Sequence, residues 1–190
     1  MEFNLTLTGR FPLLVHNSRL SDPLDPIARE MKKANGKRMK TDEDFERVAR
    51  LEFAGSLYMD EDIGPYVPGE NIQRCLVDAA RISKLGVKVT RGVFIDTDVN
   101  PLAYPGPRTV DGLWADEKFR HRASVKVGMQ RVMRCRPIFR QWQVQAHGLL
   151  DESQLNFDDL AAVAESAGMF IGLGDWRPRF GRFAATIEKG

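Results

Sequence analysis

The stretch that decides the fold lies near the carboxyl end of the sequence and reads Gly168-Met-Phe-Ile-Gly172-Leu-Gly174-Asp-Trp176-Arg177-Pro-Arg179-Phe180-Gly181-Arg182-Phe183. A helical pattern precedes it, and an alternating run, 182–188, follows it. The segment therefore predicts a helix, a glycine-rich loop and a final strand. Glycine lets backbone N–H groups approach a ligand closely and adopt positive φ, and a concave set of such groups can hold an anion.

Cations and aromatic rings lie among these glycines. Arginine presents a planar fork of donors that suits phosphate, and an aromatic ring offers a face on which a base can stack. These properties favour recognition of a phosphate-bearing single strand by Gly172, Gly174, Trp176, Arg177, Arg179 and Arg182. The alternative is a tight turn with a fringe of surface arginines, in which Trp176 packs in the core.

The net charge is only +2, but the charges are segregated along the sequence. No acidic residue occurs between 118 and 140, where the cations are Lys118, Arg120, Arg122, Lys126, Arg131, Arg134, Arg136 and Arg140. Residues 124–127 and 131–137 predict two strands around a turn, with one face in the core and the other positive. We expect five of these cations to contact phosphates: Arg120, Arg122, Lys126, Arg131 and Arg134. The alternative is a solvated face in which Arg134 or Arg136 pairs with an acid such as Asp151.

The composition, 43% apolar and 28% charged, is typical of a globular protein, and 190 residues can bury a substantial core. No apolar run reaches the roughly 20 residues that cross a bilayer, and the first residues lack the pattern of a secretory signal. Two isolated cysteines, Cys75 and Cys135, favour a reducing, cytoplasmic setting. No spacing of His, Cys, Asp and Glu suits a metal, and no Walker-type loop is present, so we expect no metal or cofactor.

The amino-terminal half predicts one strand and two helices. Residues 2–8 alternate between apolar and polar and predict a half-buried strand that Gly9 closes. Helical periodicity extends over 41–59 and then over 70–86, where Gly86 is the expected stop.

Short strands are expected at 93–95 and 142–147, and Asn156 is the expected cap of the helix before the glycine-rich loop. The basic segment 27–40 predicts an exposed, mobile loop, and the proline-rich segment 100–107 predicts a second loop. Three methionines are expected in the core, namely Met129, Met133 and Met169.

The expected order is strand, helical insertion and helix, strands, helix, strand. Without the insertion this is βαββαβ, an α+β sandwich of the ferredoxin-like or RRM-like type. We therefore predict a single domain over residues 1–190, with an inserted helical or loop segment at about 17–68.

The sequence resembles the RAMP superfamily, the repeat-associated RNA-binding proteins that form CRISPR effector backbones and guide-processing nucleases on this fold. The matching features are a first strand ending at Gly9, the segment Val67-Pro-Gly69-Glu70 before a helix, and the closing Ile171-Gly172-Leu-Gly174 and Phe180-Gly181-Arg182. It is similar to a compact stand-alone relative of the kind associated with phage genomes. The resemblance implies binding of RNA or single-stranded nucleic acid, often as an oligomer or filament, and does not imply catalysis.

Three hypotheses remain open. The first is a non-enzymatic single-stranded nucleic-acid-binding protein, with RNA favoured over single-stranded DNA, that forms a homo-oligomer. The second is a metal-independent endoribonuclease that uses His16, which follows the first strand, or His121, which lies between two arginines. The third is an oligomeric protein-binding decoy of a host RAMP-containing complex.

Overall fold

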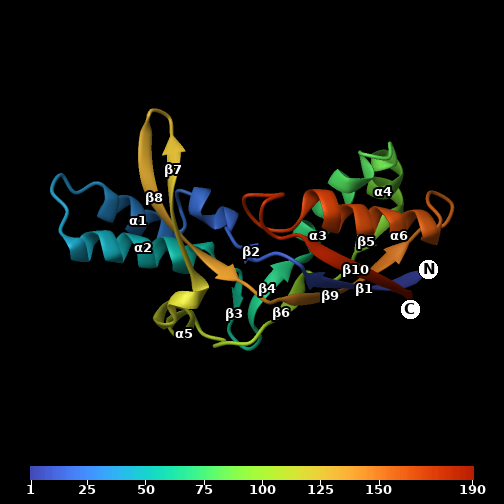
Figure 1. Cartoon of the computed structure of the whole chain (residues 1–190), viewed down its shortest axis with the longest axis horizontal. Helices are drawn as coiled ribbons and strands as arrows, with labels where there is room; N and C mark the ends of the chain where they lie inside the picture. Colours follow the sequence, from blue (N-terminus) through green and yellow to red (C-terminus); the bar gives the residue numbers. More distant parts are fainter. The chain divides into compact units, whose positions relative to one another are not determined.

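A computed structural model describes residues 1–190, apart from the side chain of Val127. The contacts within the chain divide it into two compact units. The sheet unit comprises Met1–Leu13, Met59–Pro105 and Phe139–Gly190, and the hairpin unit comprises Leu14–Tyr58 and Gly106–Ile138. The fold is mixed α+β with antiparallel sheets, as expected (Figure 1).

The sheet of the sheet unit has the order β10-β1-β9-β6-β4-β3, and β5 also pairs with β9. Its strands are β1 (Glu2–Gly9), β3 (Met59–Asp60), β4 (Gly64–Pro68), β5 (Val93–Ile95), β6 (Val99–Ala103), β9 (Gln143–Leu150) and β10 (Phe183–Lys189). The predicted alternation in β1 is confirmed, because Phe3, Leu5 and Leu7 are buried whereas Asn4 and Thr8 are exposed. One face of this sheet therefore belongs to the core.

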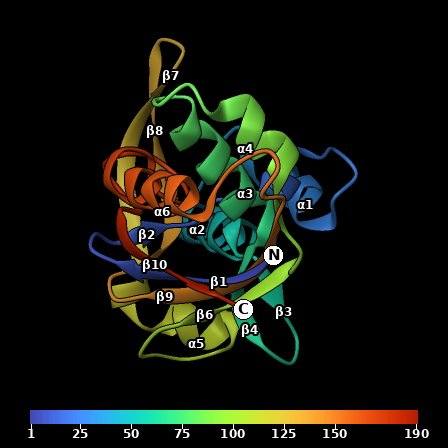
Figure 2. The same cartoon turned by 90° about the vertical axis from the view of Figure 1, so that its right-hand side faces the viewer.

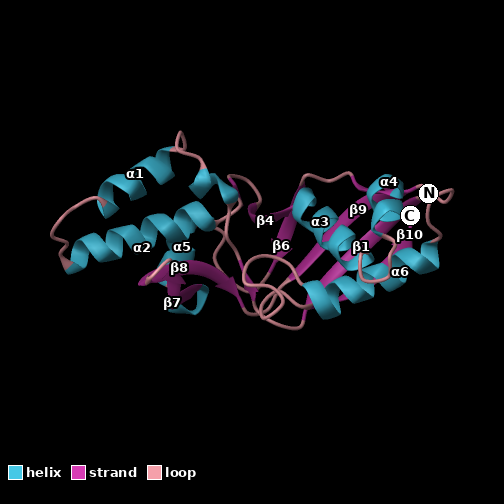
Figure 3. Ribbon diagram, turned by 90° about the horizontal axis from the view of Figure 1, so that it is seen from above, coloured by secondary structure: helices cyan, strands magenta, loops and turns pink.

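Two helices cover that face of the sheet, α3 (Gly69–Ala80) and α6 (Phe157–Ser166) (Figures 2 and 3). The short α4 (Gly86–Gly92) follows α3, and the π-helical turn η3 (Ala167–Ile171) follows α6. The apolar stripe of α3 is buried as predicted, at Ile72, Cys75, Leu76, Ala79 and Ala80. Each fully buried leucine contributes about 1.5–3 kcal/mol relative to an exposed one. The predicted cap is also confirmed, since the Asn156 side chain accepts a hydrogen bond from the Asp159 amide at 2.7 Å.

The hairpin unit combines helices with a three-stranded sheet of order β2-β8-β7, of which only the end residues Leu13 and Phe139 belong to the sheet unit. Its elements are β2 (Leu13–Leu14), η1 (Ser18–Ser21), α1 (Pro26–Asn35), α2 (Asp42–Ser56), α5 (Val110–Ala115), η2 (Glu117–Phe119), β7 (Arg120–Val127) and β8 (Gln130–Phe139). Helix α2 begins at the predicted place, where Thr41 and Asp44 form a capping box. In the core of the hairpin unit, Phe53 is fully buried and meets the Trp114 ring edge-on, with ring centres 5.3 Å apart.

The prediction of a mobile loop over 27–40 is wrong for the first part of that segment, because residues up to Asn35 form α1. The Asp25 side chain accepts from the amides of Ile27 and Ala28, which caps the helix at its amino end. Lysine and arginine are good helix formers, so a basic run does not itself argue against a helix.

Two further expectations are corrected. The proline-rich segment contains β6, since proline excludes a helix but is tolerated in a short strand. The side-chain amide of Asn100 donates to the carbonyl oxygens of Val67 and Thr97 and so fixes the entry to this strand. Helix α3 ends at Ala80, and Gly86 begins α4 instead of stopping α3.

The predicted core methionines are also wrong. Met129 is 99% exposed, Met133 60% and Met169 50%. Val132 is exposed as well, so the outer half of the β7–β8 hairpin is solvated on both faces. The expectation of one core face and one positive face therefore holds only for residues 134–137 of β8, where Cys135 and Pro137 are buried and Arg134 and Arg136 lie on the other face.

Candidate nucleic-acid interfaces

The glycine-rich loop connects η3 to β10 and is held by its own backbone. Gly172, Gly174 and Gly181 all have positive φ, at 78°, 75° and 73°. The buried Leu173 donates its amide to the Gly181 carbonyl at 2.9 Å, and the Gly181 amide donates to Pro12 at 2.8 Å. A Cβ at Gly181 would overlap the carbonyl of Leu173, so only glycine fits this crossing.

A buried thiol anchors the start of the loop. The Cys75 Sγ donates to the Gly172 carbonyl at 3.3 Å, and burial raises the pKa of Cys75 to about 12, which keeps the thiol protonated as a donor. The Gly172 amide donates to the Ala167 carbonyl at 2.8 Å. The amides of Gly172 and Gly181 are thus occupied within the protein, and the loop presents mainly its side chains to a ligand.

Those side chains combine rings with guanidinium groups. Trp176 has a φ of 51°, and its ring centre lies 6.1 Å from that of Phe180. The Arg179 guanidinium lies 6.0 Å from the centre of the Phe180 ring. Arg177 approaches Asp78 at 4.0 Å beside a surface depression of about 570 Å³ that Trp176 also lines. Trp176 is half-buried, so its ring is neither a core plug nor a fully open platform.

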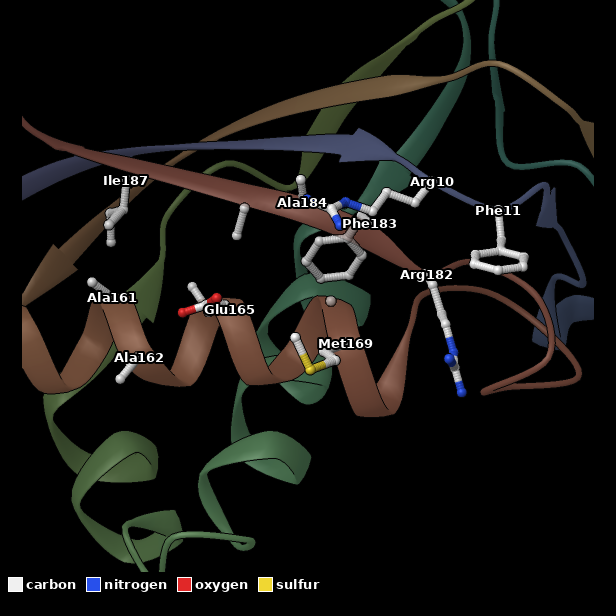
Figure 4. A pocket seen from close by; sticks show the side chains of 13 residues that line it. Arg10, Phe11, Ala161, Ala162, Glu165, Met169, Arg182, Phe183, Ala184 and Ile187 are labelled. Atoms are coloured by element: carbon white, nitrogen blue, oxygen red, sulfur yellow. The ribbon is translucent and has the colours of Figure 1, made fainter.

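Two residues that sequence reasoning missed complete this site, Arg10 and Phe11 at the end of β1. Both amides donate to the Arg182 carbonyl, at 2.8 and 3.1 Å. Phe11 is 49% exposed, and the Arg182 guanidinium lies 5.8 Å from its ring centre (Figure 4). No local motif marks Arg10 and Phe11, because the β1–β10 pairing brings them to the loop. We call this set the loop surface: Arg10, Phe11, Trp176, Arg177, Arg179, Phe180 and Arg182.

The cations of the predicted basic hairpin lie on two different faces. Residues directly opposite in β7 and β8 share a face, and successive residues alternate. The pairs Arg120–Pro137, Arg122–Cys135 and Lys126–Arg131 therefore share one face, and Ala123–Arg134 lies on the other. Four of the five predicted cations are thus brought to a common face, and Arg134 is not.

Two of the five hairpin cations are held by protein groups. Arg134 pairs with the buried Glu52 at 3.2 Å, and Glu52 also accepts from the Cys135 amide at 2.9 Å. Arg120 pairs with Glu117 at 3.0 Å and stacks 4.8 Å from the centre of the Trp114 ring. The acid partner of Arg134 is therefore Glu52, from α2, and no local sequence pattern marks Glu52 as a core residue.

The other three cations, Arg122, Lys126 and Arg131, are exposed, and we call them the hairpin face. Within the described part of the chain no ion pair involves any of them. Lys126 and Arg131 are directly opposite each other in the ladder. Like charges in that position repel each other, and an anion held between them removes the repulsion.

The two histidines proposed for catalysis lie in the hairpin unit. The His16 Nδ1 lies 3.3 Å from the Ser56 hydroxyl. Burial, followed by the nearby charges of Arg136 and Arg134, lowers the pKa of His16 to about 4. This imidazole is neutral at physiological pH and a weak base. His121 pairs across the ladder with Arg136, on the face opposite the hairpin face.

A third histidine has the geometry that the first two lack. The His147 Nδ1 lies 2.8 Å from both carboxylate oxygens of Asp96, and its Nε2 lies 3.9 Å from Glu2. Asp96 directly follows β5, and the β5–β9 pairing places it beside His147. A carboxylate in this position fixes the ring orientation and the tautomer. The spacing of 51 residues gave no sequence signal for this contact.

Among the described residues no group of three or more His, Cys, Asp and Glu side chains could hold a metal ion. No helix in the described part of the chain is long and apolar enough to cross a membrane. Comparison with protein-family models gives no match, and comparison with curated proteins gives none either. The functional argument therefore rests on the geometry of this chain.

Proposed function

We propose that this protein binds single-stranded nucleic acid, with RNA preferred, through the hairpin face and the loop surface. The observation that carries the proposal is the Lys126–Arg131 pair. Two exposed cations face each other directly in a ladder, and Arg122 lies on the same face. The repulsion between these cations destabilises the free protein, and a bound polyanion removes it. A role in binding a polyanion would therefore explain why the cations face each other.

The loop surface supplies the second requirement of single-strand binding. Backbone phosphates need cations, and unstacked bases need aromatic faces. Phe11 offers an exposed ring beside Arg182, and the Phe180 ring lies close to both Trp176 and Arg179. Such stacking is worth about 1–3 kcal/mol per base and tolerates any base sequence. The proposal is therefore sequence-tolerant binding without catalysis.

We also propose that the fold is ferredoxin-like and related to the RAMP superfamily. The chain order β1-α3-β5-β9-α6-β10 and the sheet order β10-β1-β9-β5 support this assignment. The positive φ of Gly172, Gly174 and Gly181 agrees with a glycine-rich loop of that kind. A RAMP relative is expected to assemble as a homo-oligomer, and the same relationship favours RNA over single-stranded DNA.

The test is purification of the full chain at low and at high salt, followed by the ratio of absorbance at 260 and 280 nm. We expect RNase-sensitive, DNase-resistant nucleic acid to co-purify at low salt and to be released at high salt. The variant Arg122→Gln/Lys126→Gln/Arg131→Gln is expected to purify without it. A charge-matched control, Lys84→Gln/Lys88→Gln/Arg91→Gln, removes three exposed cations near α4 and should retain it. A wild-type protein that is free of nucleic acid at low salt and ignores added RNA and single-stranded DNA would overturn the proposal.

The His147–Asp96 contact favours one second candidate function, metal-independent cleavage of RNA. His147 would accept the proton of a ribose 2′-hydroxyl, the 2′ oxygen would attack the phosphorus, and the 5′ oxygen would leave with a proton from solvent. Incubation of RNA with protein in EDTA tests this function. Products with 2′,3′-cyclic phosphate that disappear in His147→Gln and persist in His16→Gln would support it, and intact RNA would exclude it.

A further inference from the structure

Strand β10 is an edge of its sheet with backbone groups directed outward. It pairs with β1 only, at the end of the order β10-β1-β9. The Gly190 amide donates to Glu2, and the Arg10 amide donates to Arg182. In an antiparallel ladder hydrogen-bonded and non-hydrogen-bonded pairs alternate. Because Glu2–Gly190 and Arg10–Arg182 are hydrogen-bonded pairs, the N–H and C=O groups of Ala185 and Ile187 face away from β1. An exposed edge of this kind is a template for a further strand.

A groove runs along this edge between β10 and α6 (Figure 4). Its volume is about 520 Å³. Small side chains leave the space, and those that line it are Ala161, Ala162, Ala164, Ala184 and Ala185. Ile187 and the half-exposed Met169 supply larger apolar walls. An apolar channel beside an open strand edge matches the way in which domains bind extended peptides, by hydrogen bonds to the edge and by pockets for alternate side chains.

The charges along the groove give it a direction. Arg10 and Arg182 lie at the end where β10 begins, and Figure 4 shows the Arg10 side chain directed along β10 towards Ala184 and the Arg182 side chain directed away from it. Within the described residues neither guanidinium has an acidic partner, since the recorded contacts of Arg182 are the Pro178 carbonyl and the Phe11 ring. Glu165, on α6, lies farther along the groove. The groove therefore accepts an anion at one end and a cation or hydrogen-bond donor in its middle.

We propose that this groove binds the carboxy-terminal segment of a partner protein as an extra β-strand, with its α-carboxylate at Arg10. Strand β10 runs from Phe183, beside the arginines, towards Lys189. A strand added antiparallel to it therefore ends beside the arginines. About five residues fit along 183–187, at about 3.3 Å each. Alternate residues enter the groove as small or medium apolar side chains, and a basic or donor side chain faces Glu165.

This binding goes beyond recognition of nucleic acid, because the specific elements are a strand edge and an alanine-lined channel. Arg182 and Arg10 also belong to the loop surface, so a test must separate the two functions. Residue Ala185 does so, because it lies in the groove and outside both nucleic-acid surfaces. The next residue, Thr186, is exposed and points to the opposite face of the sheet, which makes it a matched control on the same strand.

The experiment uses the labelled full chain on an array of octapeptides of random sequence, attached through their amino ends. Each peptide is present once with a free α-carboxylate and once as the α-amide. We expect a subset of the free-carboxylate peptides to bind. Their amides should bind at least about tenfold more weakly, because a charge-assisted hydrogen bond is lost. Binding should be lost in Ala185→Phe and in Arg10→Glu and kept in Thr186→Phe.

Ala185→Phe should bind a 20-nucleotide oligouridylate like the wild type, so failure of the peptide proposal is separate from failure of the nucleic-acid proposal. Arg10→Glu changes an exposed side chain and keeps the test valid if Ala185→Phe does not fold. Equal binding of acids and amides, or no peptide bound above the Ala185→Phe background, would overturn the proposal. It is also overturned if no peptide binds and the β10 amides become protected from exchange as protein concentration rises, which would assign the edge to a second copy of the chain.

Discussion

The loop surface and the basic hairpin carry similar residues but hold them differently. In the loop the guanidinium groups of Arg177, Arg179 and Arg182 each contact another group of the same unit: a carboxylate, a ring, or a carbonyl and a ring. In the outer hairpin Arg122, Lys126 and Arg131 are exposed. Under the proposed function this difference predicts two roles: the loop would position bound nucleic acid, and the hairpin would attract it. A basic segment becomes informative only when the partners of each cation are known.

The largest effect on stability is expected where the hairpin is anchored. Glu52→Leu removes the buried partner of Arg134 and the acceptor of the Cys135 amide. We expect the free energy of unfolding to fall by about 3 kcal/mol, because a partly buried charge loses its counter-charge. Urea denaturation measures it. Glu30→Leu, which breaks the exposed pair with Arg47, should cost less than about 1 kcal/mol. Equal costs would show that the Glu52 pair is no anchor.

The backbone of the loop gives the next largest effect. Gly181→Ala places a Cβ against the Leu173 carbonyl at a φ of 73°, and we expect a loss of about 2 kcal/mol or more. Gly128→Ala in the hairpin turn has a similar φ of 60° but no atom within 4 Å of the new Cβ. This variant should lower the free energy of unfolding only by the roughly 1–2 kcal/mol that a non-glycine residue costs in the left-handed conformation. Thermal unfolding of both variants tests this difference, and identical losses would contradict the described crossing at Gly181.

The stability of the protein should also depend on pH, through His16. Burial and two arginines lower the pKa of His16 to about 4, from an ordinary value of 6.5. The unfolded chain therefore binds more protons than the folded one between those values, and stability decreases as pH falls from about 6.5 to 4. Allowing for the solvent that reaches the ring, the loss is about 1–2 kcal/mol. Urea titrations at pH 7.5 and 4.5 measure it. His16→Asn should flatten the dependence, and an unchanged slope would rule out His16 as its source.

The exposed cations of the loop should matter least to stability. Arg179→Gln removes a contact with the Phe180 ring at 6.0 Å and is expected to change the free energy of unfolding by less than about 0.5 kcal/mol. The same variant should weaken binding of oligouridylate, measured by fluorescence anisotropy. A stability loss without an affinity loss would make Arg179 a structural residue instead.

Local patterns were sufficient for elements whose residues repeat at a fixed period. The alternation of Phe3, Leu5 and Leu7 predicted β1, and Asn156 predicted the start of α6. They failed at α1, where the run of lysines and arginines suggested an exposed loop although these residues are good helix formers, and at β6, where prolines suggested a loop.

The site residues that were missed depend on pairing between distant segments. Arg10 reaches the loop through the β1–β10 ladder, and Asp96 reaches His147 through the β5–β9 ladder. In the sequence Glu52 resembles any other charged residue of an amphipathic helix, and only the folded structure shows that it is buried and paired with Arg134. A single sequence carries no signal of such long-range contacts, because the chemistry of each partner is unremarkable alone.

The central claim is that the hairpin face attracts a polyanion, and the salt dependence of binding tests it most directly. The association constant of the wild type for a 20-nucleotide oligouridylate is measured by anisotropy across salt concentrations, beside Arg122→Gln/Lys126→Gln/Arg131→Gln. Each phosphate contact contributes about −0.7 to the log–log slope for single strands, so the triple variant should lose about 2 from the slope. The control Lys84→Gln/Lys88→Gln/Arg91→Gln should keep the wild-type slope. A triple variant with the wild-type slope and affinity would contradict the account.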